Sequence, residues 1–248
     1  MSTNNVVPHH LFEERDADEV LRLLRENPRM VIASADEPYL FEQPFHEVMF
    51  EYLAQKHHIS SNVPAFLFEQ KRVEEIAEAV KNPLILIARE NQPQLLEHEF
   101  RPALFEYLRH HSLYEDCQYL LFADGNEDAL EFFIEHWVLG EAGERKLFDM
   151  PYCAKWLMKY ISFHNLVHSD HELLLFDYGM QAFRQKYIRQ SDFHCREAEK
   201  RLFEPAFAED MELYVDCGRT FFTDHIPLFE KAASHTLYNK YMQNKKKI

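Results

Sequence analysis

The scarcity of glycine limits most strongly what this chain can fold into. Five of its 248 residues are glycine. Tight β-hairpins and phosphate-binding loops both depend on glycine, because their backbones need conformations that other residues adopt at a cost. Most segments instead carry apolar residues with a helical period. The sequence therefore predicts an all-α protein.

Apolar periodicity places the expected helices. The stretch 16–27 has acidic residues in its first turn and apolar residues at helical spacing, and 44–58 and 63–80 each open near a proline. Further helices are expected at about 93–110, 113–123, 126–139, 151–168, 170–190, 193–204, 206–222 and 226–243. The run "NPLILIAREN" (82–91) is interpreted as buried helix. The prediction is one all-α domain over 1–248, a single bundle of seven to ten helices, with 1–15 and 244–248 frayed.

Charge and cysteine usage exclude several classes of partner. The formal net charge of −15 does not suit a phosphate backbone or an anionic membrane, so neither nucleic acid nor a membrane is expected as a partner. The four cysteines form no CxxC pair, and no apolar run is long enough to cross a bilayer. The start of the chain lacks the pattern of a signal peptide. A cytoplasmic protein with free thiols is predicted.

Three histidines stand out in "FHNLVHSDHELLLF" (163–176). If this stretch is helical, His164, His168 and His171 lie within about 60° of one another on one face. A buried imidazole needs a partner for each ring nitrogen, and a metal ion can supply one. The stripe therefore indicates either a metal site or a solvated groove with a chance cluster of histidines.

Two further helices carry candidate ligands. Glu51 and His58, seven residues apart, share one helical face, although for this pair alone an amphipathic helix with a polar edge is the favoured interpretation. Glu131 and Glu135 lie among apolar and aromatic residues in "EDALEFFIEHW" (127–137), so each either faces water or is held by a partner. A bridging carboxylate from this stretch would complete a two-metal site.

These residues together resemble the haem-oxygenase-like diiron oxidases, whose helical bundle is shared with thiaminase-type and pyrroloquinoline-quinone-synthase-type proteins. The spacing at 164–171 is similar to the family's His-x3-Asp-x2-His signature, and Glu51 with His58 matches its upstream Glu-x6-His. Glu131 and Glu135 lie where the family places a glutamate, some thirty residues earlier. The resemblance covers residues 44–190.

The resemblance implies a metal-dependent oxidase or oxygenase that uses O2 and iron, or another divalent metal, to oxidise a small organic substrate. Tyr52, Phe132, Phe133 and Trp137 would line the substrate pocket. One departure matters: His168 stands where the family has aspartate, which removes a negative charge and would weaken the hold on Fe(III). A homodimer is also compatible with this hypothesis.

The alternative is a protein without enzymatic activity. Residues 49–76 and 228–243 loosely resemble helices of regulator-of-G-protein-signalling domains, which would make the chain an acidic helical protein-interaction module. A third hypothesis is a relative of the oxidases that the His168 change has inactivated. One internal similarity, between "MFEYLAQKHH" (49–58) and "LFEYLRHH" (104–111), suggests a repeated helix, but the flanking residues do not follow it.

Overall fold

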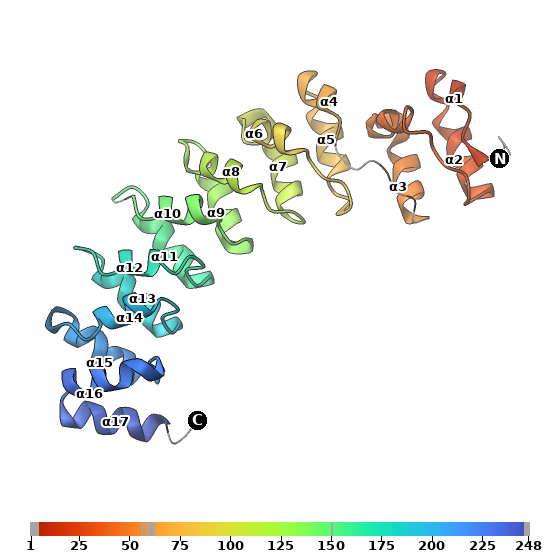
Figure 1. Cartoon of the computed structure of the whole chain (residues 1–248). Helices are drawn as coiled ribbons and strands as arrows, with labels where there is room; N and C mark the ends of the chain where they lie inside the picture. Colours follow the sequence, from red (N-terminus) through yellow and green to blue (C-terminus); the bar gives the residue numbers. More distant parts are fainter. Residues whose placement is uncertain (1–4, 56, 58, 60–62, 150, 246–248) are drawn as a thin grey trace. The chain divides into compact units, whose positions relative to one another are not determined.

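The computed structural model describes residues 5–55, 57, 59, 63–149 and 151–245 (Figure 1). These residues form 17 α-helices, joined by short 3-10 helices, turns and extended segments. Within the same ranges the β-structure is confined to isolated bridge residues, including the bridge between Val6 and Val31. The all-α prediction is confirmed. The predicted count of seven to ten helices is wrong, because several predicted helices are two short helices separated by a turn.

The chain divides into two compact units, residues 1–129 and 130–248. The first unit begins with α1 (His10–Glu13), α2 (Ala17–Glu26), η2 (Glu37–Phe41), η3 (Gln43–Phe45), α3 (His46–Ala54), α4 (Ala65–Glu69) and α5 (Val73–Ala79). It continues with η4 (Arg89–Asn91), α6 (Gln92–Leu95), η5 (His98–Phe100), α7 (Arg101–Leu108), α8 (Glu115–Gln118) and η6 (Tyr119–Phe122). Helix α9 (Glu127–His136) spans the division, and its residues from Leu130 onward belong to the second unit.

The second unit continues with α10 (Glu141–Lys146), α11 (Ala154–Phe163), α12 (His171–Leu174), α13 (Gln181–Gln190), α14 (Arg196–Arg201), η7 (Pro205–Phe207), α15 (Ala208–Asp216), η8 (Thr223–His225), α16 (Ile226–Ala232) and α17 (His235–Lys245). Helices α11, α13, α15 and α17 pack in succession, each against the next (Figure 1). The shorter helices α12 and α14 also pack against each other. The second unit is therefore a stack of helix pairs.

One buried position recurs along the chain at a nearly constant interval, and it carries an aromatic ring in every member except Val80. Its members are Tyr52, Val80, Tyr107, Phe133, Tyr160, Tyr187, Tyr214 and Tyr241, spaced 26 to 28 residues apart and all buried. Each member lies in, or directly after, the second helix of a helix pair. This spacing makes the chain a series of helical repeats, and in the second unit the pairs from α10–α11 to α16–α17 pack against their neighbours.

A buried residue on an extended segment precedes each pair. This position is taken by Ile32, Ile59, Ile87, Leu113, Leu139, Leu166, Phe193 and Phe221. The stretch "NPLILIAREN" (82–91) includes Ile87 and its extended backbone, so the prediction that this stretch forms a helix is wrong. Ile85 and Ile87 are buried whereas Leu84 and Leu86 are exposed, an alternation that belongs to extended backbone.

Glycine serves the same place in two repeats. Gly125 and Gly179 each lie two residues before a long second helix, with φ of +84° and +82°. A side chain is strained in this conformation, so glycine allows the tight turn between the two helices of a pair. The prediction of a single domain over 1–248 and of a haem-oxygenase-like bundle stay predictions.

Candidate functional site

The three histidines of the 163–176 stretch do not share a helix. Helix α11 ends at Phe163, and His164 has extended backbone with φ −133° and ψ 153°. His168 lies in the following turn, and His171 is the first residue of α12. The prediction that they form one helical stripe is wrong, because the chain leaves the helix to form the extended segment around the buried Leu166.

Two of these histidines have partners within the fold. The Nε2 of His164 donates to the carbonyl oxygen of Ile134 at 2.6 Å. The Nδ1 of His171 lies 2.7 Å from Oε1 of Glu144, and both side chains are buried. His168 is half-buried, and its ring lies 5.4 Å from that of His171, measured between centroids.

The candidate carboxylates are bound to cationic or amide side chains. Glu51 receives hydrogen bonds from Gln55 at 2.9 Å and Arg25 at 3.2 Å, which together lower its pKa, Gln55 contributing most. Lys159 binds both Glu131 and Glu135, the latter at 2.6 Å. The hydrogen bond from Lys159 lowers the pKa of Glu135.

The predicted ligands belong to both units of the chain. Glu51 and His58 belong to the first unit, and His58 lies outside the described residues. The glutamates 131 and 135 and the three histidines belong to the second unit. Across the described residues no group of three or more histidine, cysteine or acidic side chains is arranged to hold a metal ion. A site that includes His58 stays a prediction.

The predicted pocket residues occupy the core or its edge. Tyr52 is buried in the first unit, where its hydroxyl accepts a hydrogen bond from the Ile32 N–H at 3.0 Å. Phe133 is buried at the recurring ring position, Phe132 stacks on His136, and Trp137 is half-buried. The structure therefore gives Tyr52 and Phe133 a packing role.

In the second unit a buried glutamate joins each of three helix pairs, α10–α11, α12–α13 and α14–α15, to the segment that follows. Glu172 of α12 accepts hydrogen bonds from the N–H groups of His194 and Cys195, the shortest at 2.9 and 2.6 Å, and from the hydroxyl of Tyr187 at 2.7 Å. Glu144 likewise accepts from the N–H groups of Val167 and His168. These carboxylates satisfy backbone donors in part-buried places.

The third joint repeats this arrangement with a histidine. Glu199 accepts from the Phe222 N–H at 2.9 Å, and its Oε1 lies 2.7 Å from Nδ1 of the buried His225. Burial raises the pKa of Glu199 to about 7, against the opposing effect of the hydrogen bond with His225. Burial also raises the pKa of Glu172. We call Glu144, Glu172 and Glu199 the joint glutamates.

The sequence signal for these joints is the repeat itself. Each joint glutamate precedes the buried tyrosine of its own pair by 15 or 16 residues, and 27 or 28 residues separate successive glutamates. The similarity between 49–58 and 104–111 belongs to the same pattern, because Tyr52 and Tyr107 are 55 residues apart, or two repeats. Sequence reasoning missed the joints because it compared two helices and not the whole series.

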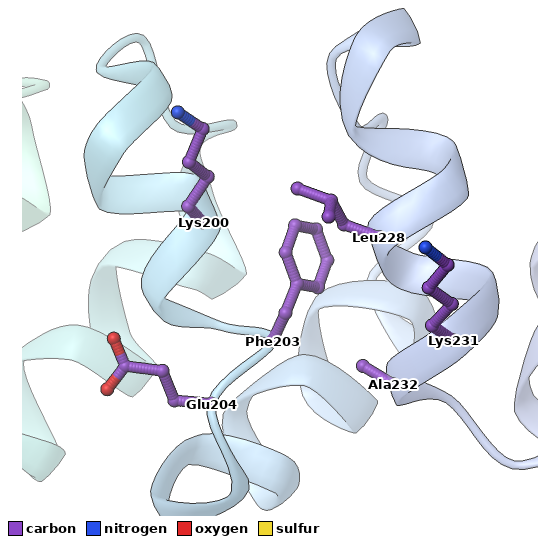
Figure 2. Close-up of a pocket in the computed structure, with 6 residues that line it drawn as sticks. All are labelled: Lys200, Phe203, Glu204, Leu228, Lys231 and Ala232. Carbon is purple, nitrogen blue, oxygen red and sulfur yellow. The ribbon is translucent and has the colours of Figure 1, made fainter.

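An open groove lies between α14 and α16 (Figure 2). It has a volume of about 410 Å³ and is lined by Lys200, Phe203, Glu204, Leu228, Lys231 and Ala232. The Phe203 ring and Leu228 side chain lie between the two lysines, while Glu204 points away from Lys231 (Figure 2). Leu228 is 41% exposed, and Phe203 is half-buried.

The charges around this groove are only partly neutralised. Lys200 pairs with Glu197 at 2.7 Å, and Glu204 pairs with Arg201 at 3.1 Å. Lys231 has no ion-pair partner among the described side chains. The groove therefore combines an accessible apolar floor with the unpaired ammonium group of Lys231 at its rim. Such a surface is complementary to an apolar side chain that has a carboxylate beside it.

Comparison of the chain with protein-family models, with curated proteins and with solved structures finds no match. No helix of the described residues has the length and apolar character needed to span a bilayer. The joint glutamates and the α14–α16 groove are therefore the features that bear on function.

Proposed function

We propose that this chain is a helical-repeat protein-interaction module and that the α14–α16 groove binds its partner. This is the non-enzymatic alternative of the sequence analysis, with a repeat architecture in place of a regulator-of-G-protein-signalling-like one. The observation that carries the proposal is the exposed apolar floor of the groove, formed by Phe203 and Leu228 beside the free Lys231. Accessible apolar side chains with a polar rim are typical of binding surfaces.

The joint glutamates support this proposal. Ionisable groups that are buried in a protein interior are frequent in catalytic sites, but each joint glutamate here accepts hydrogen bonds from backbone N–H groups of the next segment. Their polar atoms are occupied in holding one pair to the next. The exposed surface is therefore the part of the second unit left for a ligand.

The distribution of charge also favours a local binding surface in the second unit. Residues 1–129 contain 24 acidic and 11 basic residues, a formal charge of −13. Residues 130–248 contain 18 acidic and 16 basic residues, a formal charge of −2. Most of the net negative charge of the chain thus belongs to the first unit. The net charge of the second unit is too small to cancel the local positive charge of Lys231 at the groove.

Site-specific photo-crosslinking tests the proposal. Leu228 is replaced by the photoreactive residue p-benzoylphenylalanine in the full chain, which is irradiated in an extract of the cells that produce the protein. We expect one predominant crosslinked protein, lost when Lys231→Glu is added. The same photoreactive residue at Arg189, an exposed position on α13, serves as control. Equal crosslinking from positions 228 and 189 would refute a binding role for the groove.

The metal-dependent oxidase stays a second hypothesis, with Glu51, His58, Glu131, Glu135, His164, His168 and His171 as its ligands and iron as its metal. The hydrogen bonds of Glu51, Glu135 and His171 within the fold supply no support for it. Metal analysis of the chain purified without chelator or affinity-tag metal tests it.

A further inference from the structure

Comparison of the groove with the preceding repeat shows why it is open. In that repeat Phe176 is covered by Phe207, with ring centroids 5.0 Å apart and rings edge to face. The guanidinium group of Arg184 lies over both rings, 5.2 Å and 4.6 Å from their centroids. Phe176 is consequently buried.

The next repeat lacks this cover. Phe203 lies 27 residues after Phe176, so the residue equivalent to Phe207 is Ser234. Phe207 directly precedes α15 and Ser234 directly precedes α17, so the two hold the same place relative to their helices. Ser234 accepts the N–H of Leu237 through its hydroxyl at 3.2 Å and provides no ring.

The cation of the preceding repeat is also absent from this place. The residue 27 positions after Arg184 is Met211, which is buried. Phe203 packs against Phe221, His225 and Phe229, with ring centroids at 5.3, 6.1 and 6.4 Å, and it also lines the groove. The groove therefore borders a phenylalanine that lacks the equivalents of the Phe207 ring and the Arg184 guanidinium group.

We infer that the groove accepts an aromatic side chain of a partner segment, which takes the place of the missing ring, and that a carboxylate beside this aromatic residue pairs with Lys231. This inference rests on the proposed function and names the chemistry of its ligand. Aromatic side chains in a desolvated pocket are the commonest anchors of protein interfaces. The free ammonium group of Lys231 favours an acidic neighbour over a basic one.

Selection from a random dodecapeptide display library tests the inference, with the folded full-length chain as bait. We expect the enriched peptides to contain phenylalanine, tyrosine or tryptophan next to aspartate or glutamate. Synthetic versions of these peptides are then titrated against five variants by fluorescence anisotropy. Ser234→Phe, which fills the groove with a ring, and Leu228→Glu should each weaken binding on the order of tenfold or more.

The other three variants separate the causes. Ser234→Ala removes the same hydroxyl without adding a ring, so it should keep wild-type affinity. Lys231→Glu should weaken binding by roughly three- to tenfold, and Arg189→Glu on α13 should have no effect. Circular dichroism melts establish that each variant is folded, and Leu228→Glu changes an exposed residue, so the test does not depend on Ser234→Phe alone.

The outcomes distinguish the inference from the proposed function. Peptides that lose affinity with Leu228→Glu but are basic, lack an aromatic residue or tolerate Ser234→Phe would refute the inference and leave the groove as a binding surface. If no selected peptide responds to Leu228→Glu, both fail. Self-association of the chain that Leu228→Glu abolishes would show a second copy to be the occupant and would refute a separate acidic partner.

Discussion

Glu172 offers the clearest test of the joints, through the substitution Glu172→Ala. Its carboxylate receives hydrogen bonds from three donors, the N–H groups of His194 and Cys195 and the hydroxyl of Tyr187. Removing the carboxylate leaves these donors without their acceptor in a partly or fully buried place. Each lost hydrogen bond to a charged acceptor costs about 1.5–3 kcal/mol.

Two effects reduce the sum of these costs. Burial raises the pKa of Glu172, which means that the ionised carboxylate is itself destabilised by its removal from water. Water also reaches the two backbone donors, which are only part-buried, once the side chain is truncated. We therefore expect Glu172→Ala to lower the free energy of unfolding by about 3 kcal/mol.

Urea unfolding at pH 7, followed by tryptophan fluorescence, measures this change. The chain has two tryptophans, Trp137 and Trp156, and both belong to the second unit, so the signal reports on the unit that contains the joint. Glu197→Ala is the matched control, because Glu197 is an exposed glutamate whose pair with Lys200 should contribute less than about 0.5 kcal/mol. A Glu172→Ala variant as stable as this control would refute the structural role of the joint.

Three further results are expected. The pKa of Glu199 is about 7 in the fold and near 4.5 when unfolded, so its contribution to stability is full below pH 4.5 and is lost as pH rises to 7. The free energy of unfolding of Glu199→Gln should therefore rise by about 2 kcal/mol relative to that of wild type between pH 5 and 8. Urea unfolding of both proteins measures this, and a difference between them that does not change with pH would contradict it. Asp210→Ala leaves the buried Arg184 without its partner at 2.5 Å and should cost about 3–5 kcal/mol, whereas Asp224→Ala, at an exposed pair, should leave the melting temperature nearly unchanged; equal melting temperatures of the two variants would show the buried pair to be neutral. The oxidase hypothesis predicts about one or two iron ions per chain and a strong loss of iron in His171→Ala, and metal-free preparations of both proteins with identical melts would exclude it.

The helical nature of the chain could be predicted from the sequence, but the ends of its helices could not. Few glycines and a helical apolar period were sufficient to indicate an all-α protein. The prediction of a single helix around His164 is wrong because the apolar period continues through Phe163 and Leu166, although the backbone between them leaves the helix. Periodicity detects buried positions, and Leu166 is buried by an extended segment instead of a helix.

The joints escaped prediction for a related reason. Helical spacing relates residues within one helix, but Glu144 contacts His171 across 27 residues of chain, one repeat apart. A comparison of residues at intervals of 26 to 28 would have found the buried tyrosines and the joint glutamates together. The groove could not be predicted without aligning the repeats, because the absence of a ring at Ser234 has meaning only when Ser234 is compared with Phe207, its equivalent in the preceding repeat.

The stacked pairs of the second unit also bear on how the chain would respond to a pulling force. Each pair is fastened mainly to its neighbours, so tension applied at the two ends of this unit should release one pair at a time and not the whole unit at once. A released repeat of 27 residues, the interval between Tyr187 and Tyr214, would lengthen the chain by about 80 Å, its extended length less the thickness of the folded pair. The second unit would then behave as an extensible spring whose steps have a uniform size.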